Sequence, residues 1–162
     1  GGESWTRHDD MGMGFSEIAY DPASGAAVFP GYGQLIWTRD QGRSFQQKLT
    51  TEEGLARSVA FEDSTILLVG PQGFISISHN GGESWNTSRQ EPTDMLLTAV
   101  VVDSSRAYAA GAKAGMLYTA NGGKSWNKQL LARSFDVFVM ELIGDRVYAA
   151  GSEGAMIYKT VE

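Results

Sequence analysis

The sequence has no cysteine, and only two histidines and four prolines occur among its 162 residues. Without cysteine there are no disulfide bonds, thiolate metal ligands or cysteine nucleophiles, and the redox compartment stays open because such a chain is stable in either environment. No stretch reaches the roughly 20 apolar residues that a membrane-spanning helix needs. Basic residues are outnumbered 13 to 19 by acidic ones. The net charge of -6 argues against a nucleic-acid partner, because phosphate binding needs a basic face.

Helical periodicity is also missing. The apolar runs are four to seven residues long and rich in β-branched and aromatic residues, a pattern typical of short buried strands. Hydrophobic residues make up 42% of the chain, which indicates a globular protein, and the length suits a single domain over residues 1–162. None of the 20 glycines forms a phosphate-binding Gly-x-Gly-x-x-Gly at the start of a helix. We therefore expect turns rather than a nucleotide site, and no cofactor.

What the chain does have is a motif that recurs at almost constant spacing. Its pattern is Ser/Thr-x-Asp/Asn-x-Gly-x-Ser/Thr-Trp/Phe, with complete copies at residues 38–45, 78–85 and 119–126 and the end of another at 1–5. The closing aromatic residues are spaced by 40, 40 and 41 positions: Trp5, Phe45, Trp85 and Trp126. A period near 40 with several short strands per unit is typical of β-propeller blades.

Divided by this period, the repeats are residues 1–40, 41–80, 81–121 and 122–162. Each contains a polar strand after the motif, an apolar strand, a tight turn, a second apolar strand ending on glycine, and a third strand. The first apolar strands are expected at residues 15–20, 57–61, 96–102 and 137–142. The sequence thus predicts an all-β protein, a β-propeller built from four ~40-residue, four-stranded antiparallel blades.

Each position of the motif has a role in a turn between two strands. A short Asp or Asn accepts backbone N–H groups, Gly takes a positive φ, the Ser or Thr hydroxyl ties the turn together, and the aromatic ring is buried between blades. We therefore expect a structural role for the following residues: Gly2, Ser4, Trp5, Thr38, Asp40, Gly42, Ser44, Phe45, Ser78, Asn80, Gly82, Ser84, Trp85, Thr119, Asn121, Gly123, Ser125 and Trp126.

The two ends of the sequence lie at the same phase of the repeat. Residues 156–162 align with 74–80 without a gap, so joining Glu162 to Gly1 would write a further motif, with residues 4–7 as the strand that completes the last blade. The sequence begins inside a motif and without Met, so we expect a processed or trimmed product. Three closures stay open: four blades in one chain, a head-to-tail homodimer with eight blades, or a fragment of a longer propeller.

The motif resembles the Asp-box, or BNR repeat, across all four units, with Asn80 and Asn121 where that family usually has Asp. The Asp-Ser-x-Arg-x-Tyr-Ala-x-Gly run at residues 103–111 looks most like the photosystem II assembly/stability factor type of BNR propeller. Sialidase and sortilin-type propellers are more distantly similar. The resemblance implies a periplasmic or secreted protein, with the boxes at one end of the ring and functional loops at the other.

Those loops carry a candidate binding face. Its residues are Asp9, Asp10, Tyr32, Glu52, Glu53, Arg89, Glu91, Asp94, Arg133 and Asp136. Carboxylates gathered at this end of the ring could be solvent-exposed surface groups, a catalytic pair or a cation site. We expect solvent-exposed groups, because loop carboxylates are mostly exposed. The adjacent residues 8–10, His-Asp-Asp, cannot all point at one ion on a strand, so we expect no metal site.

Regular blades, short loops and the lack of a catalytic constellation favour a non-catalytic scaffold for a protein partner. By resemblance, the specific version is an assembly or stability factor for a membrane or exported complex. The alternative is a carbohydrate-binding or glycoside hydrolase-like module. Against it, Arg106 and Arg146 occupy equivalent repeat positions, and the Arg-Ile/Leu-Pro signature of sialidases is absent.

Overall fold

The computed structural model describes Ser4 and residues 14–31, 33–49, 56–90, 95–112, 115–129, 131 and 134–161. These residues form fifteen β-strands and one short 3-10 helix. The expected all-β fold is confirmed. Within the described ranges, no helix is long and apolar enough to cross a membrane.

The strands form four antiparallel sheets in which each strand pairs with the next one along the chain. Sheet 1 contains β1 (Ala19–Asp21), β2 (Ala26–Pro30), β3 (Gln34–Thr38) and β4 (Gln46–Leu49). Sheet 2 contains β5 (Ser58–Glu62), β6 (Thr65–Val69), β7 (Phe74–Ser78) and β8 (Asn86–Arg89). Sheet 3 contains β9 (Met95–Val101), β10 (Ala107–Ala112), β11 (Met116–Thr119) and β12 (Asn127–Gln129). Sheet 4 has β13 (Val137–Ile143), β14 (Arg146–Gly151) and β15 (Met156–Thr160), with the 3-10 helix η1 (Ser152–Gly154) between the last two.

The sheets are offset from the sequence repeats. The recurring motif lies in the turn between the third and fourth strands, so each four-stranded sheet takes its polar outer strand from the following repeat. Sheet 4 has three strands in the described part of the chain. Its fourth strand was predicted at residues 4–7, of which the structure describes Ser4 alone.

The first predicted strand is shorter than expected. Residues 15–20 were predicted as a strand, but β1 begins at Ala19, and Phe15 makes only an isolated bridge to Gly31. Between them, the Ser16 N–H still donates to the Pro30 carbonyl of β2 (3.3 Å), while two side chains reach the start of sheet 2. The Ser16 hydroxyl donates to the Ala56 carbonyl (3.0 Å), and the Glu17 carboxylate accepts the Val59 N–H (2.7 Å).

The register of the last strand also differs by one residue from the gap-free alignment. Ile66 pairs with Ser78, and its equivalent Ala107 pairs with Thr119. Val147 occupies the same position in sheet 4, but it pairs with Lys159 rather than with Thr160. This register turns Ile157 toward the core shared with sheet 3. A shift by one residue would turn it to the other face, because side chains alternate along a strand.

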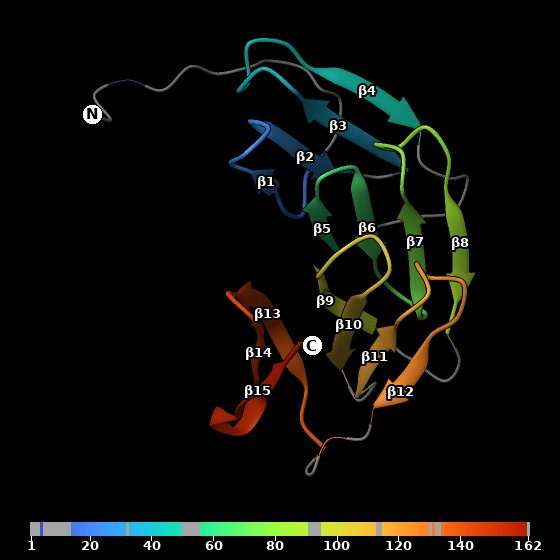
Figure 1. The fold of residues 1–162 in the computed structure, drawn as a ribbon, viewed down its shortest axis with the longest axis vertical. Helices are drawn as coiled ribbons and strands as arrows, with labels where there is room; N and C mark the ends of the chain where they lie inside the picture. The colour runs from blue at the N-terminus through green and yellow to red at the C-terminus, as the bar shows by residue number, and fades with distance from the viewer. Residues whose placement is uncertain are drawn as a thin grey trace.

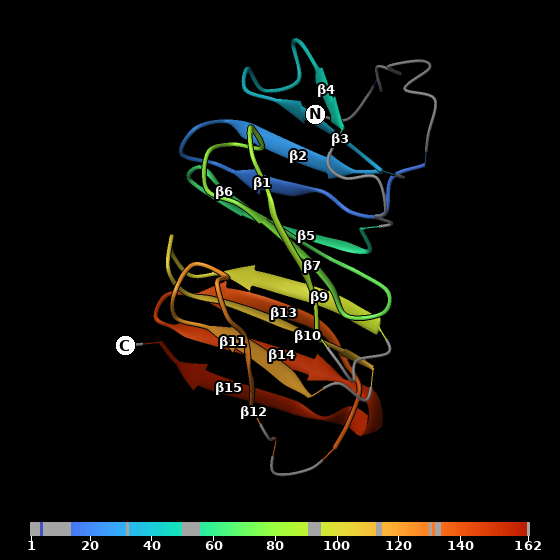
Figure 2. The ribbon, with the colours of Figure 1, turned by 90° about the vertical axis from the view of Figure 1, so that its right-hand side faces the viewer.

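The four sheets follow one another around an arc, as Figure 1 shows. The first strands β1, β5, β9 and β13 lie on its inner side, and the outer strands β4, β8 and β12 lie on the outside (Figures 1 and 2). Sheet 1 and sheet 4 form the two ends of the arc. This radial arrangement of meander sheets is that of β-propeller blades.

Hydrophobic cores lie between consecutive sheets rather than at one centre. All five residues of β6 are buried. Ile66 packs toward sheet 1 and Leu67 packs toward sheet 3. Successive side chains of a strand point to opposite faces, so a strand between two sheets must be apolar on both. The third core, between sheets 3 and 4, contains Tyr108 and Val147.

Candidate functional site

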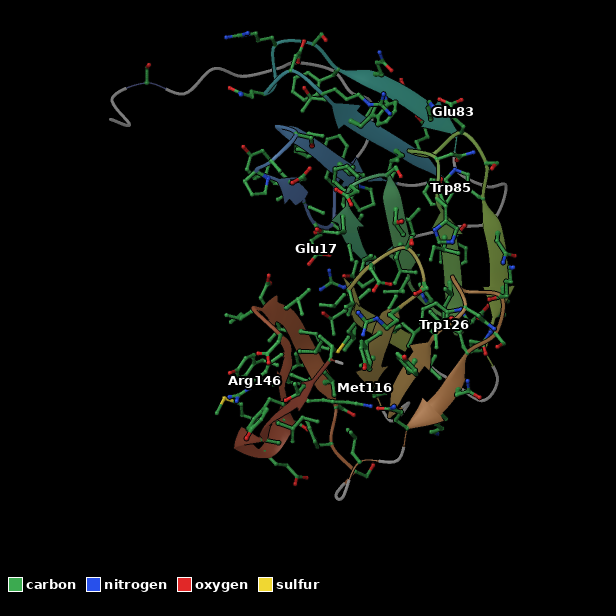
Figure 3. All side chains as sticks on the ribbon, in the orientation of Figure 1. Glu17, Glu83, Trp85, Met116, Trp126 and Arg146 are labelled. Carbon is green, nitrogen blue, oxygen red and sulfur yellow. The ribbon has the colours of Figure 1, made fainter. Side chains whose placement is uncertain are left out.

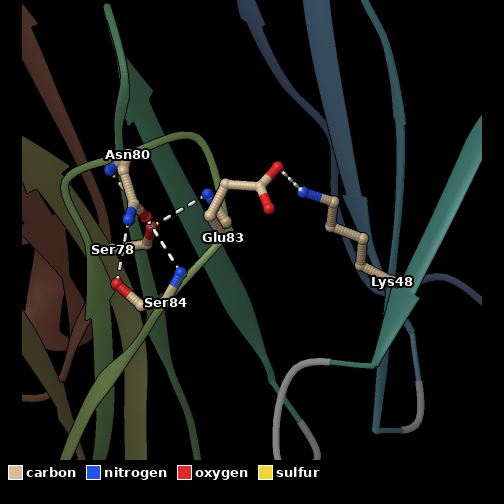
Figure 4. A network of polar contacts seen from close by, with 6 residues as sticks. Lys48, Ser78, Asn80, Glu83 and Ser84 are labelled. Atoms are coloured by element: carbon tan, nitrogen blue, oxygen red, sulfur yellow. Dashed lines mark hydrogen bonds and ion pairs between the residues drawn. The ribbon is translucent and has the colours of Figure 1, made fainter.

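The turn at residues 78–85 is closed by its own side chains (Figure 4). The Ser78 hydroxyl donates to Asn80 Oδ1 (2.9 Å) and accepts the Gly82 N–H (2.8 Å). Asn80 Oδ1 also accepts the Ser84 N–H (2.9 Å), while Asn80 Nδ2 donates to Ser84 Oγ (2.9 Å). The side chains of the first, third and seventh motif positions are thus bonded within the turn.

The turns at 38–45 and 119–126 repeat this pattern. Gly42 and Gly123 each donate their N–H to the hydroxyl of the first motif residue, at 2.9 Å in both turns. The first turn differs in having an ionisable residue at the third position, Asp40, whose carboxylate accepts both the hydroxyl (2.6 Å) and the N–H (2.8 Å) of Ser44. Hydrogen bonds from Ser44 and Thr38 lower the pKa of Asp40 to about 2, because they stabilise the charged form.

The glycine at the fifth motif position has a positive φ in all three turns, and at Gly123 the space is limited as well. Gly123 has φ 78°, in the region that residues with a Cβ rarely adopt. A Cβ on Gly123 would also lie 2.7 Å from Cγ2 of Ile77 in the neighbouring sheet. The motif therefore brings the turn of one sheet close to the third strand of the preceding sheet.

The aromatic residues of the motif pack between sheets. Trp85 contacts the core shared by sheets 1 and 2, and Trp126 contacts that of sheets 2 and 3; both are labelled in Figure 3. Their equivalent Phe45 lies on the face of sheet 1 at the end of the arc, against Phe29 with ring centroids 6.1 Å apart.

A polar contact joins the second turn to sheet 1. Lys48, on β4, donates to the carboxylate of Glu83, as the dashed line in Figure 4 shows. This hydrogen bond and the charge of Lys48 lower the pKa of Glu83. The Lys48 ammonium also lies 4.6 Å from the Trp37 ring centroid, and the Arg39 guanidinium lies 4.0 Å from it. Both cations therefore lie over the Trp37 indole, where sheets 1 and 2 meet.

The loops of the candidate binding face connect the opposite ends of the strands. In an antiparallel meander, the turns after first and third strands share one end, and the remaining connections share the other. Of the ten predicted face residues, the structure describes two, Arg89 and Asp136. The other eight lie outside the described residues: Asp9, Asp10, Tyr32, Glu52, Glu53, Glu91, Asp94 and Arg133. Gly2 and Trp5 of the motif also lie outside them.

Arg89 and Asp136 both lie at this loop end but on different sheets. Arg89 ends β8 and is exposed, with its guanidinium 6.0 Å from the Phe74 ring centroid. Asp136 precedes β13 and is half-buried. Its backbone N–H donates to Ser152 Oγ (2.9 Å), and its carbonyl accepts the Ser152 N–H (2.9 Å). The backbone of Asp136 is therefore held by the 3-10 turn that follows β14.

The carboxylates of the described part do not form a metal centre: those ranges hold no group of three or more His, Cys, Asp or Glu side chains placed to bind an ion. Glu62, the last residue of β5, was not among the predicted site residues. Burial, with the charges of Asp63 and Asp21, raises its pKa. It lies at the motif end of sheet 2, away from the candidate binding face, and only tertiary packing reveals its environment.

Comparisons with known proteins support the fold. No protein-family model matches the sequence, and no curated protein matches it. Among solved structures, the chain is similar to YCF48 bound to D1 peptide (TM-score 0.71, 16% identity), covering 91% of this chain and 51% of that one. The computationally designed Ika4 protein has a TM-score of 0.73 at 8% identity, with 95% of both chains covered. The WD40 repeats of RRP9 have a TM-score of 0.72 at 9% identity, covering 93% of this chain and 52% of that one. The chain therefore has the β-propeller fold and spans about half the length of YCF48 and of the RRP9 repeats.

Proposed function

We propose that this protein is a non-catalytic β-propeller scaffold whose loop end binds a segment of a protein partner. The observation that carries the proposal is the similarity to YCF48, a propeller solved with a bound peptide, which extends over 91% of this chain. Identity between the two is 16%, so the fold is what they share, and the partner has to be identified from the chemistry of this chain.

The loop end is the better candidate surface because the motif end already uses its polar groups. The hydroxyl, carboxylate and amide groups of the three motif turns bond to one another, as at Ser78, Asn80 and Ser84. Loops positioned by a rigid sheet scaffold commonly carry binding residues. Seven of the ten predicted face residues are acidic, so the proposed partner segment is rich in Lys and Arg.

The specific role that the repeat pattern favours is assembly or stabilisation of a membrane or exported complex. The support is the resemblance of the unit at residues 103–111 to BNR propellers of the photosystem II assembly/stability factor type. A periplasmic or secreted location belongs to the same proposal.

Binding of fluorescent peptides to charge variants tests the proposal. A panel of basic, neutral and acidic 15-residue peptides is titrated against the wild type, Asp136→Lys and Arg89→Glu by fluorescence polarisation. We expect basic peptides to bind the wild type and to lose about fivefold or more in affinity with Asp136→Lys, because attraction becomes repulsion. Arg89→Glu should strengthen the same interaction. The matched control is Lys124→Glu, an exposed reversal at the motif end.

Two results would contradict the scaffold. Loss of peptide binding in Lys124→Glu but not in Asp136→Lys would place the interaction at the motif end. Turnover of chromogenic glycosides that disappears in Asp9→Asn or Glu52→Gln would establish the carbohydrate-active alternative.

A further inference from the structure

Each sheet of the arc has two faces with different neighbours. We call the face that packs on the preceding sheet the leading face, and the one that packs on the following sheet the trailing face. The three cores of the chain each join the trailing face of one sheet to the leading face of the next. The leading face of sheet 1 and the trailing face of sheet 4 remain at the two ends of the arc (Figure 1).

The trailing face of sheet 4 is apolar and exposed. Met156 and Tyr158 are 73% and 60% exposed. Strand pairing shows their equivalents in sheet 3: Met156 lies opposite Ala150 as Met116 lies opposite Ala110, and Tyr158 lies opposite Tyr148 as Tyr118 lies opposite Tyr108. In sheet 3 these positions are covered by sheet 4, and Met116 is only 4% exposed. The repeat itself therefore shows that a sheet covers such a face.

The leading face of sheet 1 is exposed at its first strand, while Ala27 and Ile36 on the same face are buried. Ile18 and Tyr20 are 56% and 55% exposed, whereas Met140, the equivalent of Ile18 in sheet 4, is 4% exposed. Beside Tyr20 lies a hollow of about 310 Å³ lined by Phe29 and Phe45, among others. Exposed apolar areas of this kind mark interaction surfaces.

A second hollow lies where sheet 4 meets sheet 3. It has a volume of about 340 Å³ and its lining includes Tyr108, Tyr118, Lys159 and Val161. Tyr118 is the equivalent of Ile77, the residue that approaches Gly123 in the motif turn ending at Trp126. The hollow thus occupies the position that motif turns with their tryptophans fill at the two earlier seams. No described strand pairs with the outer edge of β15.

The sequence contains a segment suited to this position. Residues 1–5 read Gly-Gly-Glu-Ser-Trp, identical to residues 81–85, which lead into the outer strand of sheet 2. An open strand edge is a template for pairing with another segment.

We propose that two copies of this chain pair head to tail into one closed ring of eight blades. The trailing face of sheet 4 in each copy covers the leading face of sheet 1 in the other, and residues 1–7 of each copy supply the outer strand of its partner's last sheet. The resulting seam has the composition of the three seams already present within the chain. A closed ring leaves no apolar end face, which is why a head-to-tail contact that closes is favoured over a filament.

A second copy fits these faces for two reasons. In the described part of the chain, the three cores leave one face of each kind without a facing sheet, and a two-fold rotation places these faces against each other at both seams. The arc also has the curvature of rings about twice its length, since it superposes on 51% of YCF48 and 52% of the RRP9 repeats. An equal number of sheets is then needed to complete the circle.

The first test is the mass of the 162-residue chain in solution by light scattering at micromolar concentration. We expect twice the chain mass of 17.5 kDa. Met156→Glu and Tyr20→Lys each place a charge in both seams and should raise the dissociation constant at least about tenfold. Asn127→Glu, an exposed position on β12 away from both end faces, is the control and should leave the dimer intact.

Mixing the two variants provides a sharper test. A mixed pair of Met156→Glu and Tyr20→Lys has one unaltered seam and one with opposite charges, so equimolar mixing should restore dimers that neither variant forms alone. Trp5→Ser should also weaken the dimer at least about tenfold if residues 1–7 complete the partner sheet. Circular dichroism verifies that each variant keeps its β structure.

Three results would overturn the proposal. A folded wild-type monomer would mean that other blades or another partner cover the end faces. Assemblies that grow beyond two copies would mean that the head-to-tail contact does not close. A dimer that survives Met156→Glu and Tyr20→Lys would use a different surface, and a dimer unaffected by Trp5→Ser would remove residues 1–7 from the seam.

Discussion

At the scale of single residues, the recurring motif combines hydrogen bonding with close approach. The first and third positions, such as Thr119 and Asn121, bond across the turn, with Thr119 Oγ1 donating to Asn121 Oδ1 (3.0 Å). The glycine at the fifth position then allows the turn to approach the preceding sheet. The residue types follow from the sequence, but the approach of Ile77 to Gly123 depends on how two sheets pack.

Gly123→Ala should therefore be more destabilising than the same change at another turn glycine. It adds a Cβ at φ 78° and 2.7 Å from Cγ2 of Ile77, so we expect a loss of about 2–4 kcal/mol in the free energy of unfolding. Gly144→Ala is the matched control, because its φ is 62° and no atom lies within 4 Å of an added Cβ. It should cost about 1 kcal/mol in urea denaturation. Equal losses would refute a role for the close approach.

Asp40 should make the first motif turn sensitive to acid. Its folded-state pKa of about 2 is below the ordinary value of 3.8, so its contribution to stability is present above pH 3.8 and is lost as pH falls toward 2. Asp40→Asn reproduces the residue type of the other two turns and should flatten the decline in melting temperature over this interval. Other acids titrate in both proteins, so the difference between the two curves isolates Asp40. Parallel curves would contradict the lowered pKa.

At the scale of elements, the strand pattern is predictable where both faces of a strand are apolar. A second apolar strand was expected in each repeat, and in the second repeat β6 is that strand, with every residue buried. The start of β1 was not predictable, because residues 15–20 are as apolar as other strands while the side chains of Ser16 and Glu17 bond to Ala56 and Val59. The register of β15 was also missed by one residue. The observed register follows the alignment of residues 156–158 with 116–118 rather than with 74–76, and it turns Ile157 toward sheet 3.

The inner strands should carry most of the stability. Leu67 is fully buried in the core between sheets 2 and 3, so Leu67→Ala should lower the free energy of unfolding by about 2–5 kcal/mol. Asn127→Ala, on the exposed outer strand β12, should change it by less than about 0.5 kcal/mol. Chemical denaturation at one fixed protein concentration measures both. Similar effects at the two positions would contradict the packing described here.

At the scale of the whole molecule, stability comes from three similar seams rather than one core. Each sheet needs its neighbours, as in other repeat architectures, and among the described residues the terminal sheets each lack one neighbouring sheet. The proposed dimer supplies the missing neighbour to both.

Thermal unfolding should then depend on protein concentration. Because association stabilises the folded chain by mass action, the melting temperature of the wild type should rise by several degrees over a hundredfold increase in concentration. Met156→Glu should show a lower melting temperature that does not change with concentration. Calorimetry across that range measures both, and a constant wild-type value would contradict the shared seams.

The sequence by itself determined the strand-rich blade, its period and the chemistry of its turns. These depend on local features: alternating or continuous apolar runs, glycines at positive φ, and short polar side chains that bond within eight residues. Only the tertiary structure decided the curvature of the arc (Figure 1) and the exposure of Met156 and Tyr158 at its end. Their equivalents in sheet 3 are similar in sequence but lie inside a seam, since burial depends on which sheet comes next and not on the residues themselves.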